Sequence, residues 1–249
     1  MKIALISDIH ANVLALQAVL ADTRRQKVDR IFNLGDILYG PLWPQETHDL
    51  LQSLNAETIQ GNEDRDVYDA AEELMAHRSV LRFTVQSLSE RAIGWLRSLP
   101  KTHRIDDVFL CHGTPDSDLI YLLEDVSDGT ARLRKESEIV KQLGDCAAPV
   151  VVCGHTHTAR VVRLSSGQLI VNPGSVGLPA YLDEVPVKHR MQSGTPNASY
   201  ALLEKRMDGW QAEIKSIAYD HDAAARQARQ LGTVAGNYWA QWLATGRAD

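Results

Sequence analysis

The sequence predicts an α/β fold with mixed β-sheets and helices packed outside them. In its earlier part, short apolar runs alternate with helix-like stretches, the order typical of βαβ units. In its later part, apolar runs flank Ser166-Gly167 and Asp208-Gly209, dipeptides that favour hairpin turns. No internal repeat or low-complexity linker divides the 249 residues, so we expect a single domain spanning residues 1–249.

The earlier part predicts five strands with helices between them. Asn12 is placed to cap a helix in which Val13, Leu16 and Val19 recur at helical spacing. Residues 44–54 and 66–98 also have helical patterns. The strand-like runs, each bounded by Pro, Gly or polar residues, are 2–7, 30–34, 58–60, 107–111 and 150–153.

The later part predicts two hairpins followed by helix. Residues 161–164 and 169–171 form the first pair of strands, and residues 200–204 and 210–217 form the second. Residues 222–244 predict one or two helices that carry Tyr238, Trp239 and Trp242. These three aromatic residues could form an oligomer contact, although packing onto the sheet is the commoner use of such a stripe.

Composition excludes several classes of protein. The formal net charge of −6 disfavours stable binding to a nucleic-acid backbone. No run approaches the roughly 20 apolar residues of a membrane span, and the N-terminus lacks the features of a signal peptide. Cys111, Cys146 and Cys153 are odd in number and have no CxxC spacing, which argues against a disulfide framework or a thiolate zinc site. We therefore expect a cytoplasmic location.

The strongest functional signal is that every early strand ends in a metal-ligand residue type. Any one of these residues alone is more typical of a turn, a helix cap or a hydrogen-bonded histidine. In open α/β sheets, however, the carboxyl ends of the strands converge on one crevice. We therefore expect these side chains to meet: Asp8, His10, Asp36, Asn62, His112, His155 and His157.

These residues stand in motifs that resemble a known family. DIH at 8–10, GDILYG at 35–40, GNED at 61–64, CHG at 111–113 and GHTH at 154–157 occur in the order found in calcineurin-like metallophosphoesterases. NPGSVGLP at 172–179 resembles the compact bacterial and archaeal branch of phosphodiesterases and dinucleoside polyphosphate hydrolases. The resemblance implies a four-layer α/β/β/α sandwich with two mixed β-sheets and a dinuclear metal site.

The resemblance also implies how the ligands are shared. Asp8, His10 and His157 would bind one metal ion, and Asn62, His112 and His155 the other. Asp36 would bridge the two ions, whose mutual repulsion requires an anion between them. Imidazole and carboxylate ligands suit Mn, Fe, Zn, Co or Ni, and this donor set does not select among them.

The implied reaction is hydrolysis of a phosphate ester by a hydroxide that bridges two divalent metals. A phosphodiester, a nucleotide or a dinucleoside polyphosphate would be the substrate. The alternatives are a catalytically silent scaffold that binds other proteins, and a protein phosphatase. The proposed ligand positions are all filled, which disfavours the scaffold, and the chain has no obvious extension for docking a peptide. A homo-oligomer remains open.

Glu63 departs from the family pattern. Many relatives have a histidine after Gly-Asn, where it can protonate the leaving group. Glu63 could take that role beside Asp36 and Asn62 in catalysis, or it could orient a water, a ligand or Arg65. Nearby cations favour an ionised Glu63, so we expect an orienting role. Asn12 could either cap its helix or contact the substrate. Arg65 is a further candidate for substrate binding.

Two less regular segments are candidates for specificity loops, residues 114–129 and 180–197. The second contains Lys188, His189 and Arg190, which could bind a phosphate or a nucleotide, although such charges are more often merely solvated. Asn172 and Ser175 could line the site, but the turn geometry of Asn-Pro-Gly-Ser explains them equally well.

Overall fold

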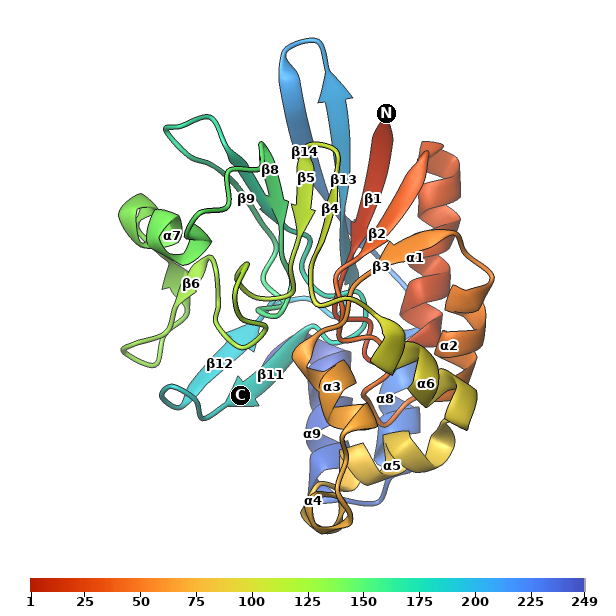
Figure 1. Cartoon of the computed structure of the whole chain (residues 1–249). Coiled ribbons are helices and arrows are strands. Elements are labelled where there is room, and N and C mark those ends of the chain that lie inside the picture. The colour runs from red at the N-terminus through yellow and green to blue at the C-terminus, as the bar shows by residue number, and fades with distance from the viewer. Residues whose placement is uncertain (249) are drawn as a thin grey trace.

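Two five-stranded mixed sheets face each other and carry helices on their outer surfaces (Figure 1). The computed structural model describes residues 1–248. The strand order is β14-β13-β1-β2-β3 in the first sheet and β4-β5-β8-β10-β9 in the second. The predicted four-layer α/β/β/α sandwich is confirmed.

The first sheet combines three parallel strands with an antiparallel hairpin. Its strands are β1 (Lys2–Ile6), β2 (Arg30–Asn33), β3 (Ala56–Thr58), β13 (Ala198–Arg206) and β14 (Gly209–Ile217). β1 pairs in parallel with β2 and antiparallel with β13, so the C-terminal hairpin completes a sheet that begins with the N-terminus. The flanking helices include α1 (Val13–Gln26), α2 (Pro44–Gln52), α8 (His221–Arg229) and α9 (Val234–Thr245).

The second sheet contains two hairpins, β4 with β5 and β9 with β10, and its edge strand β4 was not predicted by the sequence analysis. Its strands are β4 (His103–Ile105), β5 (Val108–Leu110), β8 (Val150–Val152), β9 (Arg160–Arg163) and β10 (Leu169–Asn172). α7 (Glu136–Leu143) covers its outer face and was also not predicted. The hairpin of β9 and β10 around Ser166-Gly167 is confirmed.

Alternate strand residues fill separate cores. Ile3 and Leu5 lie between the two sheets, whereas Ala4 and Ile6 face the helices, because successive side chains of a strand point to opposite faces. Cys111 and Cys153 are buried between the second sheet and α7. They therefore act as small apolar residues on the face opposite the sheet interface.

The helical stretch predicted at 66–98 is four helices and begins earlier than expected. They are α3 (Asn62–Tyr68), α4 (Glu72–His77), α5 (Ser79–Ser87) and α6 (Glu90–Ser98). Extended backbone at Ala71 and Leu88 separates successive helices, and the Ser89 side chain caps α6 by accepting a hydrogen bond from Ala92 N. A helical pattern alone does not register such local caps.

The segment 180–197 is more regular than expected. It contains a hairpin of β11 (Ala180–Asp183) and β12 (His189–Gln192). The segment 114–129 contributes β6 (Glu124–Asp125), which pairs with β7 (Arg132–Leu133). Within residues 1–248, no helix is both long enough and apolar enough to span a membrane.

Candidate metal centre

The metal-ligand residue types meet at one end of the two sheets. Asp8 and Asp36 follow β1 and β2 of the first sheet, and His112 and His155 follow β5 and β8 of the second. Ligand atoms within 4.8 Å of one another form three triplets: Asp8, His10 and His157; Asp36, His112 and His155; and His10, Asp36 and Glu63. The first triplet is one of the ligand sets that the resemblance implied. The role of Asn62 as a ligand beside His112 and His155 stays a prediction.

The backbone at these positions is strained. Asp8, His10, Asp36, His155 and His157 have φ angles between 48° and 68°, in the left-handed region that residues other than glycine rarely adopt. Such conformations cluster at functional sites, where the surrounding structure enforces them. Here they occur shortly after the ends of β1, β2 and β8, where the chain leaves the two sheets.

Glycines allow the surrounding loops to approach the ligands. A Cβ atom on Gly61 would overlap Oδ1 of Asp36, and one on Gly154 would overlap Oγ of Ser7 and crowd Oδ2 of Asp8. The loops that carry Asn62 and His155 therefore pass within contact distance of the two aspartates only because these positions lack side chains.

Backbone carbonyls orient three of the four histidines. Nδ1 lies 3.1 Å from Tyr39 O in His10, 2.7 Å from Leu34 O in His112 and 2.6 Å from Leu178 O in His157. A carbonyl oxygen only accepts, so each Nδ1 carries the hydrogen and each Nε2 presents its lone pair when the ring is neutral.

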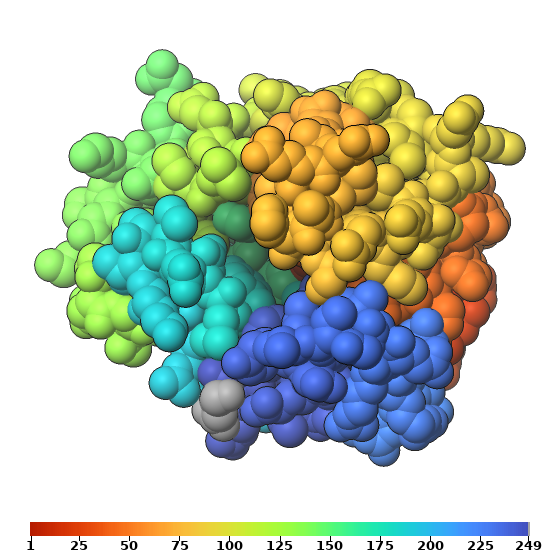
Figure 2. Space-filling view, turned by 90° about the horizontal axis from the view of Figure 1, so that it is seen from below, coloured from red at the N-terminus to blue at the C-terminus, as the bar shows by residue number. Residues whose placement is uncertain are grey.

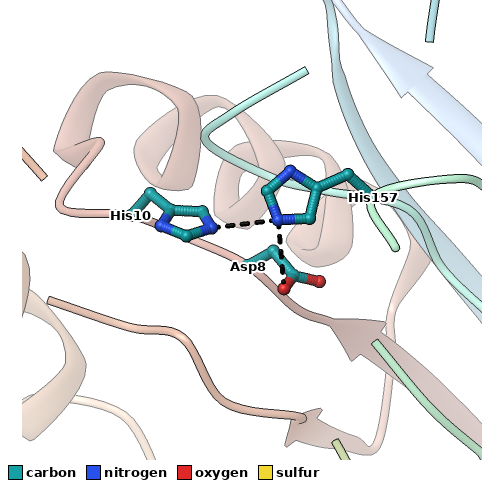
Figure 3. Close-up of side chains that lie close together, drawn as sticks. All are labelled: Asp8, His10 and His157. Atoms are coloured by element: carbon teal, nitrogen blue, oxygen red, sulfur yellow. Dashed lines mark hydrogen bonds and ion pairs between the residues drawn. The ribbon is translucent and has the colours of Figure 1, made fainter. Parts of the chain in front are cut away.

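The lone pairs of His10 and His157 converge (Figure 3). Their Nε2 atoms are 3.0 Å apart, and Nε2 of His157 is 3.4 Å from Oδ1 of Asp8. Two lone pairs at this distance repel unless a proton or a metal cation lies between them. The arrangement therefore fits a cation held by Asp8, His10 and His157.

Several buried atoms of the cluster lack hydrogen-bond partners among the described residues. They are Oδ2 of Asp8, Oδ1 of Asn62 and Nε2 of His112. Nε2 of His112 lies 3.2 Å from Oδ2 of Asp36 without forming an aligned hydrogen bond. Buried polar atoms are rarely left unsatisfied, so these atoms without partners fit divalent cations, which would replace any proton on Nε2 of His112.

The charged side chains of the cluster shift one another's pKa values. Burial opposes ionisation of Asp36, but the neighbouring His112 more than offsets burial and holds the pKa of the carboxyl well below its usual range. Burial likewise opposes charge on His112, whereas Asp36 and Asp8 raise its pKa to about 10. For His155, burial and then His112 lower the pKa to about 4. Because a metal binds the neutral imidazole, the lowered pKa of His155 favours metal binding and the raised pKa of His112 opposes it.

Asp64 fixes the loop that carries Asp36, and the sequence analysis did not predict Asp64 as a site residue. Its buried carboxylate accepts hydrogen bonds from the backbone N–H groups of Asp36, Ile37 and Gly61 at 2.8 to 2.9 Å. It fixes Asp36 against the start of α3. The signal was present, because an acidic residue three positions after Gly61 is typical of a helix N-terminus.

Glu63 belongs to the third triplet, with His10 and Asp36, although the sequence analysis did not predict it as a metal-ligand residue. Its Oε2 is 3.2 Å from Nδ1 of His10, and its backbone N–H donates to Oδ1 of Asp36 at 2.8 Å. Burial raises the pKa of Glu63 to about 7, although contact with His10 opposes this shift. Burial thus acts against the cation effect that led us to expect an ionised side chain. Arg65 pairs with Asp118 instead of Glu63.

A cavity of about 290 Å³ opens over the cluster. In Figure 2 the hollow lies between the hairpin of β11 and β12 (cyan), the segment around α3 (orange) and the C-terminal helices (blue). Asn62 and Glu63 line it beside His10, Asp36, His155 and His157. The aromatic residues Tyr39, Tyr181, Trp239 and Trp242 complete the wall. None of these four aromatic residues was predicted to line the site.

Asn12 does not line this cavity, so its predicted contact with substrate is not supported. The side chain is fully buried. Its Oδ1 accepts from Ala15 N and caps α1, and its Nδ2 donates to Gly177 O and to the hydroxyl of Tyr219. All of these bonds are made within the protein. Of the two roles considered for Asn12, the structure therefore shows the helix cap.

His189 and Arg190 also lie outside the cavity lining. His189 is buried, with Nδ1 2.7 Å from Val187 O and Nε2 3.0 Å from the Tyr121 hydroxyl. It cannot bind a phosphate without giving up a partner. Arg190 lines a separate hollow with Arg160, beyond the hairpin. Contact between Arg190 and a larger substrate stays a prediction.

Asn172 and Ser175 brace the loops behind the metal-ligand residues. Asn172 Nδ2 donates to Gly154 O at 2.7 Å, and Ser175 Oγ donates to Asp8 O at 2.7 Å. Neither lines the cavity, and turn geometry accounts for both.

Comparison with known proteins agrees with this geometry. The calcineurin-like phosphoesterase superfamily domain matches residues 1–204. The chain is 28% identical to a metallophosphoesterase from Sphaerobacter thermophilus, whose crystal structure superposes with a TM-score of 0.75 and covers 99% of this chain and 100% of that one. It is 27% identical to an uncharacterized protein from Methanocaldococcus jannaschii over 241 residues, 88% of each chain.

Proposed function

Because this chain belongs to the calcineurin-like phosphoesterase superfamily, we propose that it hydrolyses small phosphoesters in the cytoplasm with two divalent cations bound at the cluster described above. The observation that carries the proposal is the convergence of Nε2 of His10 and His157 with the Asp8 carboxylate, beside a second triplet of the same composition. A single ion cannot use both triplets.

The residues present fit the cations. Asp8, His10 and His157 would hold one, Asn62, His112 and His155 the other, and Asp36 both. When bound, the cations would stabilise the phosphoryl oxygens and lower the pKa of an attacking water to about 7. These donor atoms do not select among Mn, Fe, Zn, Co and Ni as the bound metal.

The chain's own groups prepare the site for this reaction. The carbonyls of Tyr39, Leu34 and Leu178 fix three imidazole rings, and Asp64 fixes Asp36, so little reorganisation is needed when the substrate binds. Glu63 is placed to orient His10 and groups entering the cavity. The surrounding aromatic side chains exclude water and strengthen electrostatic interactions inside the cavity.

The first test measures metal content and hydrolysis in the same preparation. Manganese-loaded protein is expected to contain two ions per chain and to hydrolyse bis(p-nitrophenyl) phosphate. A chelator should abolish the activity, and manganese should restore it. Asp36→Asn should lower both metal content and activity, whereas the exposed control Asp116→Asn should change neither. At most one ion per chain, or hydrolysis that persists after complete metal removal, would contradict the proposal.

The natural substrate is proposed as a class. A phosphodiester, a nucleotide or a dinucleoside polyphosphate would present the anionic phosphoryl group that two cations attract. A screen of manganese-loaded protein across monoesters, diesters and nucleotides ranks these candidates by kcat/KM.

A further inference from the structure

His155 differs from the other three histidines of the cluster. Its ring nitrogens have no hydrogen-bond partner within residues 1–248, whereas a backbone carbonyl lies beside Nδ1 in each of the others. Its backbone has a φ angle of 68°, a left-handed conformation that persists only where surrounding contacts enforce it. Other contacts must therefore hold His155 in the triplet that it forms with Asp36 and His112, which we call the second cation site.

The Tyr181 hydroxyl supplies one of these contacts. It donates to the carbonyl oxygen of His155 at 3.0 Å, while the backbone N–H of His155 donates to Oδ1 of Asp8 at 3.2 Å. The peptide groups on both sides of His155 are thereby held. The Tyr181 ring itself lies edge-on to the His157 imidazole, with centroids 4.6 Å apart. The hydroxyl and the ring of Tyr181 therefore contact different metal-ligand residues.

Tyr121 contacts both the Tyr181 hydroxyl and the His155 ring. Its ring lies beside the imidazole with centroids 4.8 Å apart, and its hydroxyl oxygen is 2.9 Å from that of Tyr181. A phenol has one hydrogen to donate. Because Tyr181 donates its hydrogen to His155, the hydrogen between the two hydroxyls comes from Tyr121. A chain of hydrogen bonds therefore runs from Tyr121 through Tyr181 to His155.

The far end of this chain lies in the hairpin of β11 and β12. Nε2 of His189, a residue only 3% exposed, is 3.0 Å from the Tyr121 hydroxyl, and Nδ1 is 2.7 Å from Val187 O. Asp183, which is opposite His189 in the hairpin, places Oδ2 3.4 Å from the same hydroxyl. Buried polar networks of this kind are rigid when their members are paired. The hairpin is thus connected to His155.

From these contacts we propose that Tyr181 and Tyr121 are positioning residues for His155 and set the affinity of the second cation site. The inference rests on the proposed binding of two cations and adds the groups that tune one of them. Removing a partner that orients a metal-ligating residue typically lowers metal affinity by about 10–100-fold. Because Tyr181 belongs to β11, occupation of this site and the order of the hairpin should also be linked.

Stepwise manganese binding to the apo protein tests the proposal without any substrate. Free manganese, measured by electron paramagnetic resonance, gives the two Kd values, and His112→Ala identifies the step that belongs to the second site. Tyr181→Phe removes the hydroxyl but keeps the ring beside His157, so the second-site Kd should rise roughly tenfold or more and the first-site Kd should stay unchanged. Tyr200→Phe is the matched control, because it removes a buried hydroxyl that bonds Asp22 instead, and it should change neither Kd.

A double-mutant cycle tests whether the two hydroxyls act in one chain. Tyr121→Phe keeps the ring beside His155 and should raise the second-site Kd severalfold. The double variant should match Tyr181→Phe within about twofold, because the Tyr121 hydroxyl acts through that of Tyr181. Independent, multiplicative losses in the double variant would overturn the chain as the cause.

Hydrogen exchange supplies a readout separate from the binding constants. Saturating manganese should slow amide exchange within residues 180–192 of the wild type, because a cation that is bound tighter when the hairpin is ordered also orders the hairpin. Tyr181→Phe at the same occupancy should lose part of this protection, and Tyr200→Phe should keep it. A destabilised hairpin without a link to the metal would exchange faster with and without manganese by the same factor, which would count against the proposal.

The outcomes separate this inference from the proposed function. Equal second-site Kd values for wild type and Tyr181→Phe, both shown to be folded by thermal unfolding, overturn the inference. If Tyr181→Phe does not fold, Tyr121→Phe decides by the same comparison. Two bound ions without hydrolysis of any ester contradict only the phosphoesterase proposal, because binding is measured without turnover. Binding of at most one ion contradicts the dinuclear site and this inference together.

Discussion

Glu63 contacts both a metal-ligand residue and the open cavity, so its role depends on whether it transfers a proton. A general acid contributes typically 10²–10⁴-fold, and its contribution grows as the leaving alcohol becomes more basic. We expect Glu63→Gln, which keeps the shape of the side chain but removes its acidic proton, to slow an aryl ester and an alkyl ester by similar factors. The measurement is kcat/KM for a p-nitrophenyl ester and for an ester with an alkoxide leaving group, at constant metal content.

A different outcome would identify Glu63 as the proton donor. In that case Glu63→Gln would slow the alkyl ester far more than the aryl ester, since p-nitrophenolate leaves without protonation. Glu63→His would then selectively improve poor leaving groups. Burial raises the pKa of Glu63 to about 7, so the protein environment alone does not exclude this role, and the comparison of leaving groups decides it.

Tyr200 and Asp22 form a buried pair remote from the metal centre that links stability to pH. The Tyr200 hydroxyl donates to Oδ2 of Asp22 at 2.6 Å, and this bond, ahead of contacts with Arg25, holds the pKa of Asp22 below its ordinary value. A lowered carboxyl pKa stabilises the folded state above the unfolded pKa of about 3.9, and the effect is lost as pH falls through the folded pKa.

Removing the Tyr200 hydroxyl tests that linkage. Tyr200→Phe should lower the free energy of unfolding by about 1–2 kcal/mol at pH 7, because it leaves the buried carboxylate without its main donor. The difference from wild type should narrow below about pH 4, because Asp22 is protonated there in the unfolded chain, and it should vanish once the folded protein is also protonated, below its lowered pKa. Urea unfolding at both pH values measures it, with the exposed Tyr238→Phe as control. A defect of the same size at both pH values would show that the hydroxyl does not act through the ionised carboxylate.

The sequence predicted a loop at residues 180–197, but part of this segment forms the hairpin of β11 and β12. The hairpin forms one wall of the cavity. Tyr181, Leu182 and Asp183 line the cavity, and the Tyr181 hydroxyl donates to His155 O at 3.0 Å. The element therefore contacts both the metal cluster and the space where a substrate binds. Its position supports the expectation that this segment affects substrate choice.

Shortening this hairpin should change substrate preference more than metal content. We expect replacement of residues 184–188 by Asn-Gly, a two-residue turn that keeps the Asp183–His189 pair, to alter relative rates across a nucleotide panel, because the removed turn adjoins Asp183, which lines the cavity. A similar replacement of residues 165–168, between β9 and β10, is the control, since that turn does not line the cavity. Unchanged relative rates after trimming would make the hairpin a surface connection only.

Hydrophobic periodicity predicted some helices and strands correctly but not all of their boundaries. The pattern correctly predicted β1, β2 and the two late hairpins, whose apolar runs are bounded by turn residues. It missed the short strand β4, which has only three residues and pairs with β5 alone. It also missed α7, although Glu138 accepts a hydrogen bond from Lys135 N at the start of that helix, a local capping signal. It also merged four helices into one stretch, because capping by residues such as Ser89 decides the breaks.

At the scale of the whole molecule, the metal centre joins the two sheets. Asp8, His10 and Asp36 come from the first sheet and its loops, and His112, His155 and His157 from the second. A cation that binds Asp8 together with His157 therefore ties the N-terminal and central parts of the chain. Metal binding is coupled to folding in such an arrangement, because the unfolded chain does not bring these ligands together.

Metal binding should accordingly raise thermal stability. At a free metal concentration about 100 times Kd, one site contributes roughly 2.7 kcal/mol, which corresponds to roughly 5–10 °C in Tm for a chain of this size. Differential scanning calorimetry of apo and manganese-loaded protein measures the shift. Asp36→Asn should reduce it, and Asp116→Asn should retain it. An unchanged Tm at saturating manganese would indicate that the clusters do not bind the ion in the folded protein.

The sequence by itself determined the layered α/β fold and which residues form the candidate metal cluster. Each ligand type directly follows an apolar strand, and parallel strands place their carboxyl ends together, so short motifs such as GDILYG and GHTH suffice to place them. Each motif is a local sequence signal, and the geometry of parallel strands brings the motifs together in space.

Only the tertiary structure decided what surrounds that cluster. Trp239 and Trp242 lie over 80 residues beyond His155 in the chain, and a helical aromatic stripe looks the same whether it packs in a core or lines a cavity. Asn12 and His189 could have faced substrate, but neighbours from distant segments, Gly177 and Tyr121, occupy their polar atoms. Which partner reaches a side chain depends on how the layers pack, and residue spacing along the chain does not record it.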